Sequence, residues 1–279
     1  MTSQEELLCC LVCGSTIGRD ADAVAPVRRC TACHFGWTRA SLAAPRELYN
    51  RRPGGPANYL EASSRRYESD LRLRWLLGTG IPASLLEVGC AGGFFLEAAA
   101  KAGIAATGID VSLAAVRFAR EELGLAVTAG SFEEASFADP VEALCAFAVL
   151  EKVEDPHDFL LAARQALAPG GRLAVEVPNI ASAAARRLGA RWPQAQAGYQ
   201  RWHFTPDSLA RLITRHGFQV IARDTVFSRF YWRPIPRLAH ARELFLADWL
   251  ASRSPKLSHP SLGDVIRLIA RRPEIGRAT

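Results

Sequence analysis

Hydrophobic residues change their spacing repeatedly between residues 71 and 221. Short apolar runs that end in glycine, proline or an acid are typical of strands, whereas apolar residues at every third or fourth position are typical of helices. The runs predict strands at 85–88, 105–110, 126–129, 141–149, 173–179 and 217–221. The stretches between them predict helices at 71–77, 95–102, 113–123 and 160–167, and another after Thr205. Because strands and helices alternate along the chain, we expect an α/β fold with a parallel sheet covered by helices on both faces.

The segments outside this region have other patterns, which divide the chain into residues 1–40, 41–75, 76–232 and 233–279. Residues 41–75 are interrupted by proline and glycine and predict a linker and a helical lid, in which Tyr49, Tyr59 and Tyr67 either cover a ligand pocket or simply pack. In the last segment, two apolar sets at helical spacing predict a helical extension that packs on the core or on a partner chain, with membrane-surface binding as the alternative. The sets are Leu238, Ala241, Phe245 and Trp249, followed by Leu262, Val265, Ile266 and Ile269.

Composition narrows the class of protein. The 279 residues are 49% hydrophobic and 22% charged, and no apolar run reaches the roughly 20 residues of a membrane span. The first ten residues carry acids and no basic residue, unlike a secretory signal, so we expect a cytoplasmic protein without a transmembrane segment. The net charge of +6 favours anionic partners but does not choose among nucleic acid, nucleotides and lipid head groups.

Four cysteines near the N-terminus have the spacing of a metal site. Cys10 and Cys13 form one Cys-x-x-Cys pair, and Cys30 and Cys33 form a second one. Two such pairs at this separation match a zinc ribbon, in which four thiolates close a tetrahedral structural Zn²⁺ site. Cys9 in place of Cys10, and His34 as a fourth ligand, are the alternatives. Gly14 and Gly36 suit the positive-φ turns that follow such pairs.

The stretch 85–96, which reads LLEVGCAGGFFL, is the predicted ligand site. A buried strand ends at Glu87, a glycine-rich turn follows, and a helix begins, so backbone N–H groups are presented to a ligand. Glu87 has the chemistry to bind the amine or hydroxyl of that ligand. The spacing does not fit a dinucleotide-binding fingerprint, because Ala91 and Phe94 stand where two of its glycines belong. A phosphate-binding loop is excluded as well, since no Gly-Lys-Ser/Thr follows the turn.

The turn resembles motif I of the class I S-adenosylmethionine-dependent methyltransferases, with Ala91 in place of the middle glycine. This resemblance implies a Rossmann-like, doubly wound and mainly parallel seven-stranded sheet with S-adenosylmethionine bound at the carboxyl ends of the strands. A Val-Leu-Glu segment after the strand at 141–149, a Pro-Gly-Gly turn at 169–171 and the segment 203–206 (His-Phe-Thr-Pro) match further motifs of the family in the right order. The residues expected to contact the cofactor are Glu87, Gly89, Cys90, Ala91, Gly93, Asp110, Val111, Ser131, Phe132 and Ala148.

Two of these residues have specific expected roles. Asp110 follows the turn by about twenty residues, where a doubly wound nucleotide fold places a carboxylate on the ribose hydroxyls. The alternative is that Asp110 caps the helix that Ser112 begins. The resemblance implies that Phe132 stacks on the adenine and makes Glu133 a candidate for the acid that often binds the adenine amino group.

The sequence offers two candidates for the catalytic group. Lys152 stands where family members have a histidine that acts as a base in some relatives, but a partly solvated lysine is mostly protonated at neutral pH. His203 is the other candidate for general-base chemistry or substrate binding, and a hydrogen-bonded loop histidine is the alternative interpretation.

The resemblance therefore implies an S-adenosylmethionine-dependent methyltransferase, and O-methylation of a small-molecule, sugar or lipid-like acceptor is our first expectation. A zinc-containing ribosomal or transfer RNA methyltransferase is the second, although no dense cluster of Lys and Arg with interleaved aromatic residues supports it. A catalytically inactive fold that serves as a binding or scaffold module is the third. The oligomeric state is not predicted.

Overall fold

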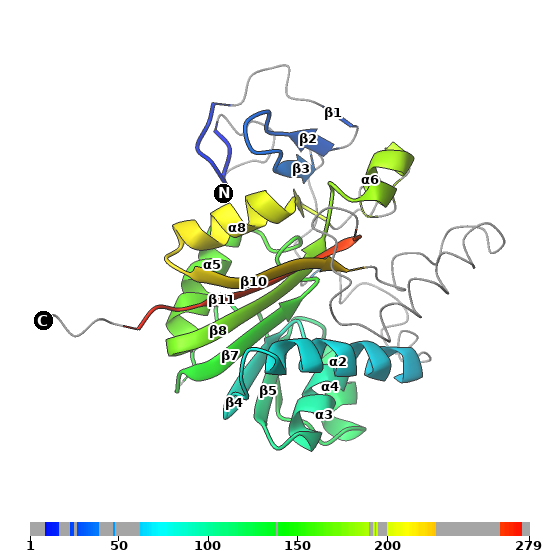
Figure 1. The fold of residues 1–279 in the computed structure, drawn as a ribbon. Coiled ribbons are helices and arrows are strands. Elements are labelled where there is room, and N and C mark those ends of the chain that lie inside the picture. The colour runs from blue at the N-terminus through cyan, green and yellow to red at the C-terminus, as the bar shows by residue number, and fades with distance from the viewer. Residues whose placement is uncertain are drawn as a thin grey trace, which may run out of the picture. The chain divides into compact units, whose positions relative to one another are not determined.

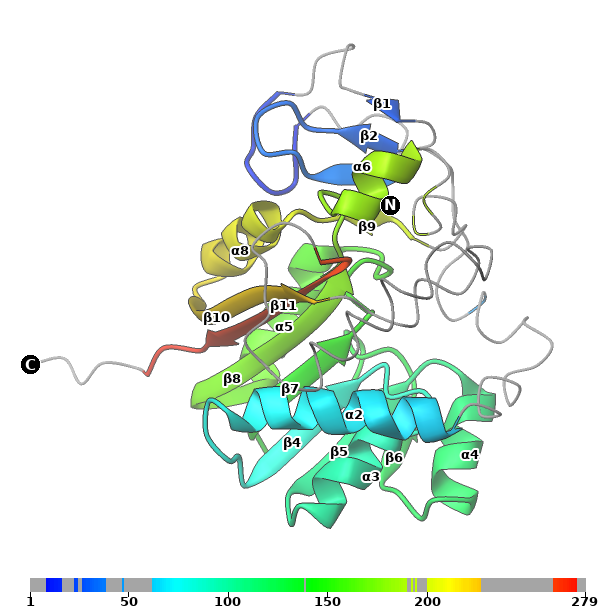
Figure 2. The ribbon, with the colours of Figure 1, turned by 45° about the vertical axis from the view of Figure 1, so that its right-hand side comes forward.

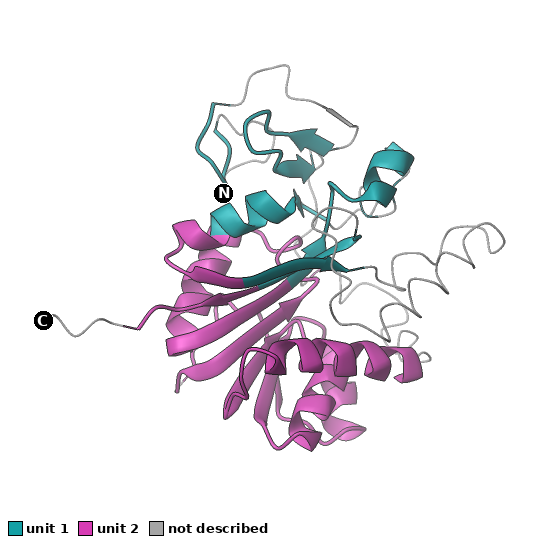
Figure 3. Ribbon diagram, in the orientation of Figure 1, with its two compact units in different colours: residues 1–42, 176–212, 222–268 teal, residues 43–175, 213–221, 269–279 magenta. Residues whose placement is uncertain are grey.

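The computed structural model describes residues 9–16, 23–24, 27–38, 47, 62–137, 139–189, 192, 194, 200–226 and 263–274. The chain forms two compact units (Figure 3). One unit consists of residues 1–42, 176–212 and 222–268, and the other consists of residues 43–175, 213–221 and 269–279. Tyr49, Tyr59 and the predicted helix through Leu238 and Trp249 lie outside the described residues.

A seven-stranded sheet forms the core, and its strand order is β10-β11-β8-β7-β4-β5-β6. The pairs β4·β5, β4·β7 and β5·β6 are parallel. The central strands are buried on both faces, as their uninterrupted apolar runs require. The strands are β4 (Ser84–Val88), β5 (Ala105–Asp110), β6 (Val127–Ala129), β7 (Val141–Phe147), β8 (Leu167–Pro178), β10 (Gln219–Val226) and β11 (Val265–Arg271). The predicted α/β fold with a mainly parallel seven-stranded sheet is confirmed.

Helices join the parallel strands. Figures 1 and 2 show α2, α3 and α4 on the same side of β4, β5 and β6. The helix α4 begins where the side chain of its N-cap, Ser112, accepts a hydrogen bond from the Ala115 N–H, and α5 begins at Asp155 and Pro156 in the same manner. The helices are α2 (Ala62–Leu77), α3 (Phe94–Lys101), α4 (Leu113–Glu121), α5 (Pro156–Ala166), α6 (Ala183–Leu188) and α8 (Pro206–Arg215). Among the described residues, no helix is both long and apolar enough to cross a membrane.

A small antiparallel sheet with the order β1-β2-β3-β9 contains the N-terminal segment. Its strands are β1 (Ala23–Val24), β2 (Val27–Arg29), β3 (Gly36–Thr38) and β9 (Trp202–His203). The β9 strand comes from the C-terminal half of the chain and pairs with β3 through Trp37–Trp202 and Gly36–His203. The Phe35 ring is fully buried and lies 5.9 Å from the Trp202 ring and 5.4 Å from the Phe204 ring.

The prediction of a helix around Val265 and Ile269 is wrong, because this segment forms the strand β11. Arg272 exchanges backbone hydrogen bonds with Gly170 and Gly171, and Asn179 donates to the Asp264 carbonyl, so β11 runs antiparallel to β8. Residues 265–270 are buried on both faces apart from the partly exposed Arg267. A strand buried on both faces lacks the polar alternation that distinguishes it from a helix.

Candidate functional site

The strand register brings the predicted ligand residues to one edge and one face of the sheet. Glu87 of β4 lies level with Gly108 of β5 and with Cys145 of β7. Side chains alternate along a strand, so Asp110 and Phe147, each two residues further on, share the face of Glu87. Both lie at the carboxyl ends of their strands. In an open α/β sheet this edge is where ligands bind.

The turn after β4 has the backbone conformation that its glycines predict. Gly89 has a φ of 69° and Gly93 has a φ of 81°. Ala91, which replaces the middle glycine of the motif, has a φ of 48° and so keeps the left-handed conformation despite its side chain. Gly93 precedes α3, whose first N–H groups face the turn. The substitution at Ala91 therefore leaves the shape of the turn intact.

Replacement of Gly89 by alanine is expected to lower the free energy of unfolding by about 2–4 kcal/mol, which combines left-handed backbone strain with overpacking. A Cβ atom at Gly89 would lie 2.4 Å from Cγ2 of Val149. Gly103→Ala is the matched control, because Gly103 has a φ of 79° but no atom within 4 Å of an added Cβ. Urea unfolding of both variants checks this prediction. Equal losses for the two would show that the Val149 contact carries no cost.

Asp110 organises the edge through two backbone hydrogen bonds. Its Oδ2 accepts from the Ala91 N–H at 2.8 Å, and its Oδ1 accepts from the Ser112 N–H at 2.8 Å. Ser112, and not Asp110, is the N-cap of α4. Each carboxylate oxygen keeps a lone pair for a ligand hydroxyl. Burial raises the pKa of Asp110, while the two N–H groups and the charge of Lys152 lower it in part.

Glu87 is the buried carboxylate of the edge, with 5% of its surface exposed. Its Oε2 has no hydrogen-bond partner among the described residues. Burial raises the pKa of Glu87 well above its usual value; Arg72 opposes this shift, and Asp110 adds to it. A buried carboxylate oxygen without a partner is costly to the free protein, and a ligand ammonium or hydroxyl would satisfy it.

The loop after β7 holds a lysine in place. Ala148 has a φ of 57°, and its carbonyl accepts a hydrogen bond from Lys152 Nζ. The same Nζ lies 3.0 Å from Oε1 of the buried Glu151. Lys152 therefore supplies a positive charge near Asp110.

The remaining predicted contact residues differ in how accessible they are. Cys90 is 5% exposed, and its Sγ would lie 2.8 Å from a Cβ at Gly108, so it packs the turn against β5. Val111 is half-buried, and the Ser131 hydroxyl donates to the Glu133 carboxylate. The Phe132 ring is buried, with ring centroids 5.6 Å from Phe137 and 5.3 Å from Phe159. In this structure, therefore, Phe132 packs against other rings.

The four predicted cysteines form one cluster. The Sγ atoms of Cys10, Cys13, Cys30 and Cys33 all lie within 4.8 Å of one another. Four sulfurs bound tetrahedrally at about 2.3 Å from one ion would be separated by about 3.8 Å. The Cys10–Cys33 distance of 3.5 Å and the Cys13–Cys30 distance of 3.6 Å are close to that value. Burial raises the pKa of Cys10 to about 11, whereas hydrogen bonds with Ser15 outweigh burial and lower the pKa of Cys13 to about 6. A cation bound among the four sulfurs would stabilise all of them as thiolates.

Two details of the cysteine segment differ from expectation. Cys9 is exposed and lies outside the cluster, as does His34. The prediction of a positive φ at Gly36 is wrong: the position after the second pair is His34, with a φ of 60°, whereas Gly36 is part of β3. Gly36 is instead required for space, because a Cβ there would lie 3.0 Å from Val27 Cγ1 and 3.1 Å from His203 Cβ.

His203 is a buried residue of the small sheet, and its hydrogen bonds define its tautomer. Thr38 Oγ1 lies 2.6 Å from the Gln200 carbonyl, which can only accept, and 2.9 Å from His203 Nε2. The single hydroxyl proton goes to Gln200, so Nε2 must carry the proton that it donates to Thr38. Nδ1 is then the nitrogen with the lone pair. Burial and the charge of Arg29 lower the pKa of His203 to about 3, so the ring is neutral and a weak base.

The structure therefore brings Glu87, the turn 89–93, Asp110 and the loop after β7 to one edge of the sheet. His203 and the cysteine cluster belong to the other unit. Sequence reasoning missed Arg72, whose guanidinium lies 4.8 Å above the Phe147 ring. Arg72 lies in the helix predicted at 71–77, and no sequence motif marks it as a site residue.

Comparisons with known proteins agree with this architecture. A ubiquinone biosynthesis O-methyltransferase of Caulobacter sp. (strain K31) is 30% identical over 142 residues, which cover 46% of this chain and 56% of the relative. The chain therefore spans little more than half the length of that relative.

Solved structures show the same fold. A SAM-dependent methyltransferase of Thermotoga maritima, described as a possible histamine N-methyltransferase, has a TM-score of 0.57 at 18% identity and covers 81% of this chain and 98% of its own. The N-methyltransferase NodS of Bradyrhizobium japonicum WM9, in complex with S-adenosyl-L-homocysteine, has a TM-score of 0.54 at 20% identity over 82% of this chain and 97% of its own. The family model described as "Methyltransferase domain" matches residues 59–223, more than half of the sequence, and the chain accordingly belongs to this methyltransferase family.

Proposed function

We propose that this protein is an S-adenosylmethionine-dependent methyltransferase that methylates an oxygen atom of a small-molecule acceptor. The observation that carries the proposal is the pair of carboxylates, Glu87 and Asp110, on one face at the carboxyl ends of adjacent parallel strands. Glu87 suits the ammonium of the cofactor's methionine part, and Asp110 suits its ribose hydroxyls. The names of the ubiquinone biosynthesis relatives support an oxygen acceptor.

The bound cofactor would supply a methyl group on a sulfonium, with a neutral thioether as the leaving group. The chain's own task is then to position the acceptor in line and to receive its proton. Lys152 is a cation held by Ala148 and Glu151, so we propose that its charge supports Asp110 and that it does not act as a base. For His203, whose low pKa of about 3 makes it a weak base, we propose substrate binding through Nδ1, the ring nitrogen that keeps a lone pair, in preference to general-base chemistry.

We further propose that the four-cysteine cluster holds a structural Zn²⁺. Cys10, Cys13, Cys30 and Cys33 provide four sulfur ligands and leave no open position for catalysis. The cytoplasmic location and a preference for small molecules over nucleic acid are parts of the same proposal.

Transfer of a labelled methyl group tests the function. We expect the purified protein to move label from S-adenosylmethionine into a small-metabolite extract, and Glu87→Ala, which removes a proposed cofactor contact, to reduce the transfer at least tenfold. Total RNA serves as a second acceptor in a separate assay. Label in RNA alone would support the nucleic-acid alternative, and cofactor binding without transfer to either pool would support a catalytically inactive fold.

A further inference from the structure

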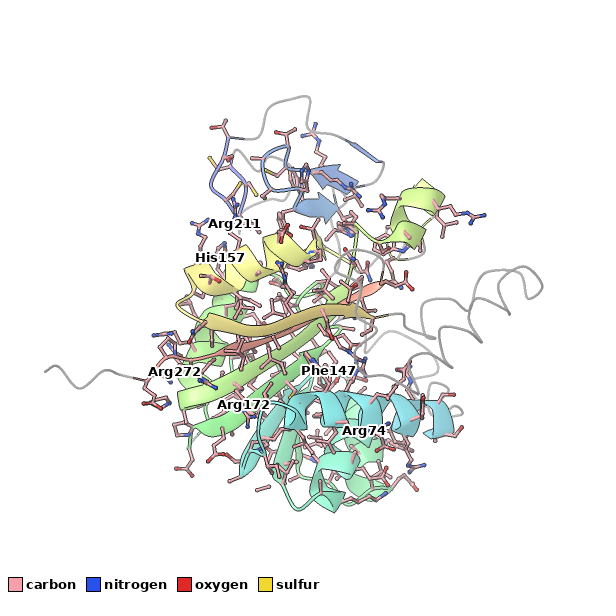
Figure 4. All side chains as sticks on the ribbon, viewed as in Figure 1. Arg74, Phe147, His157, Arg172, Arg211 and Arg272 are labelled. Atoms are coloured by element: carbon pink, nitrogen blue, oxygen red, sulfur yellow. The ribbon has the colours of Figure 1, made fainter. Side chains whose placement is uncertain are left out.

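The helix α2 places a cation above the carboxylate edge described above. Arg72 of α2 is half-buried, and its guanidinium carbon lies 4.8 Å from the centroid of the Phe147 ring. Phe147 comes from the end of β7, beside α2 (Figure 4). Because Glu87 is level with Cys145, Phe147 stands one step along the same face from Glu87 on the adjacent strand. The contact between Arg72 and Phe147 therefore puts a positive charge next to Glu87.

The charges around Glu87 make this cation important. The ionisable groups that face it are Arg72 from α2, Asp110 from β5, Cys90 from the turn and Cys145 from β7. Burial and Asp110 both disfavour a charged Glu87, and of these described neighbours Arg72 is the one that favours it. Without that charge, a carboxylate with 5% exposure next to a second carboxylate would take up a proton more readily. A protonated Glu87 loses the charge attraction to an ammonium.

We propose that Arg72 is a positioning residue of the cofactor site, whose guanidinium, held against the face of Phe147, keeps the Glu87 carboxylate ionised for the ammonium of the bound methionine part. This inference rests on the proposed function and deepens it. It assigns α2 a role in cofactor affinity through Glu87, beyond that of a helix that covers the core. The Phe147 ring itself is fixed by Phe95 of α3, at a centroid distance of 4.9 Å.

Calorimetric titration with S-adenosyl-L-homocysteine between about pH 5.5 and about pH 8.5 tests the proposal. Arg72→Met is expected to weaken affinity by up to about tenfold, with the largest loss at the acid end of this range, because without the neighbouring cation the Glu87 carboxylate takes up a proton more readily. Loss of the cation raises the pKa of Glu87, so the fall in affinity on acidification should begin at a higher pH than in the wild type. Arg72→Lys keeps the charge and should largely restore the wild-type pH profile. Arg74→Met is the matched control, because Arg74 lies on the exposed side of α2 (Figure 4).

A double-mutant cycle separates this role from a structural one. In the Glu87→Gln background, Arg72→Met should no longer move the pH profile. The proposal is overturned if Arg72→Met leaves the wild-type profile unchanged, or if the shift persists without the Glu87 carboxylate. If Arg72→Met does not fold, Phe147→Leu removes the aromatic face and undergoes the same two comparisons. Failure of the wild-type protein to bind S-adenosyl-L-homocysteine would refute the proposed function itself, which distinguishes the two failures.

Discussion

Asp110→Ala is expected to weaken the binding of S-adenosyl-L-homocysteine about a hundredfold, as expected for losing two hydrogen bonds to a charged acceptor, at about 1.5 kcal/mol each. The Asp110 carboxylate joins the turn at Ala91 to the start of α4 at Ser112 through its two oxygens. Its removal takes away the acceptor for the ribose hydroxyls and also leaves the turn, in which Ala91 has a φ of 48°, without one of its hydrogen bonds. Calorimetric titration measures the loss.

Two comparisons identify the origin of that loss. Asp155→Ala removes another carboxylate that accepts a backbone N–H bond, from His157 at 2.7 Å, at the start of α5. This variant should lose about 1 kcal/mol of stability as a missing N-cap, without a comparable loss of affinity. A ligand without the 2′-hydroxyl should bind more weakly to the wild type but about equally to Asp110→Ala. An Asp110→Ala protein that still discriminates between the two ligands would contradict ribose binding.

If the cysteine cluster holds zinc as proposed, chelation of the metal is expected to unfold the small sheet and lower the thermal midpoint by about 10 °C or more, because structural zinc contributes directly to folding. The N-terminal strands are two or three residues long, and Phe35, Trp37 and Trp202 are buried beside the cluster's segments. Chelation should therefore expose tryptophan and shift its fluorescence to longer wavelength. Metal analysis should find about one zinc per chain before treatment.

The chain contains a matched control for this experiment. Cys30→Ser should reproduce the effect of chelation, since a serine hydroxyl is a poor zinc ligand. Cys9→Ser should have the stability and metal content of the wild type, because Cys9 is exposed and lies outside the cluster. A purified protein without metal, or a chelated protein with unchanged fluorescence and thermal midpoint, would show that the four cysteines only pack.

Most of the core sheet could be predicted because each parallel strand is an apolar run that ends in a distinctive turn. The strand β5 has the predicted bounds, Ala105–Asp110, and β4 begins one residue earlier than expected. The strand β11 could not be recognised, because Val265, Ile266 and Ile269 satisfy helical spacing and a strand buried on both faces shows no alternation. The start of α2 at Ala62 was also missed, within a polar stretch that was assigned to the linker.

The residues of the candidate site also differ in whether the sequence could predict them. Glu87, the turn and Asp110 were predictable, because the alternation of strands and helices places them at one edge of the sheet. The cysteine pairs were predictable because their spacing fixes their chemistry. The contact of Arg72 with Phe147 and the hydrogen bond between Thr38 and His203 both join segments that are far apart in the sequence. They depend on which face of a helix or strand packs against the distant segment. A single sequence contains no local pattern that reports such contacts.

The pairing of β3 with β9 also bears on the order in which the protein is made. Thr38 and His203 are 165 positions apart, so the ribosome completes the first three strands of the small sheet long before the fourth. During that interval β3 presents an open edge, and unpaired edges promote association between nascent chains. On the zinc proposal, early metal binding would close the two cysteine pairs and shorten the lifetime of the aggregation-prone form. The supply of zinc during translation, more than afterwards, would then determine how much of the chain reaches its native sheet.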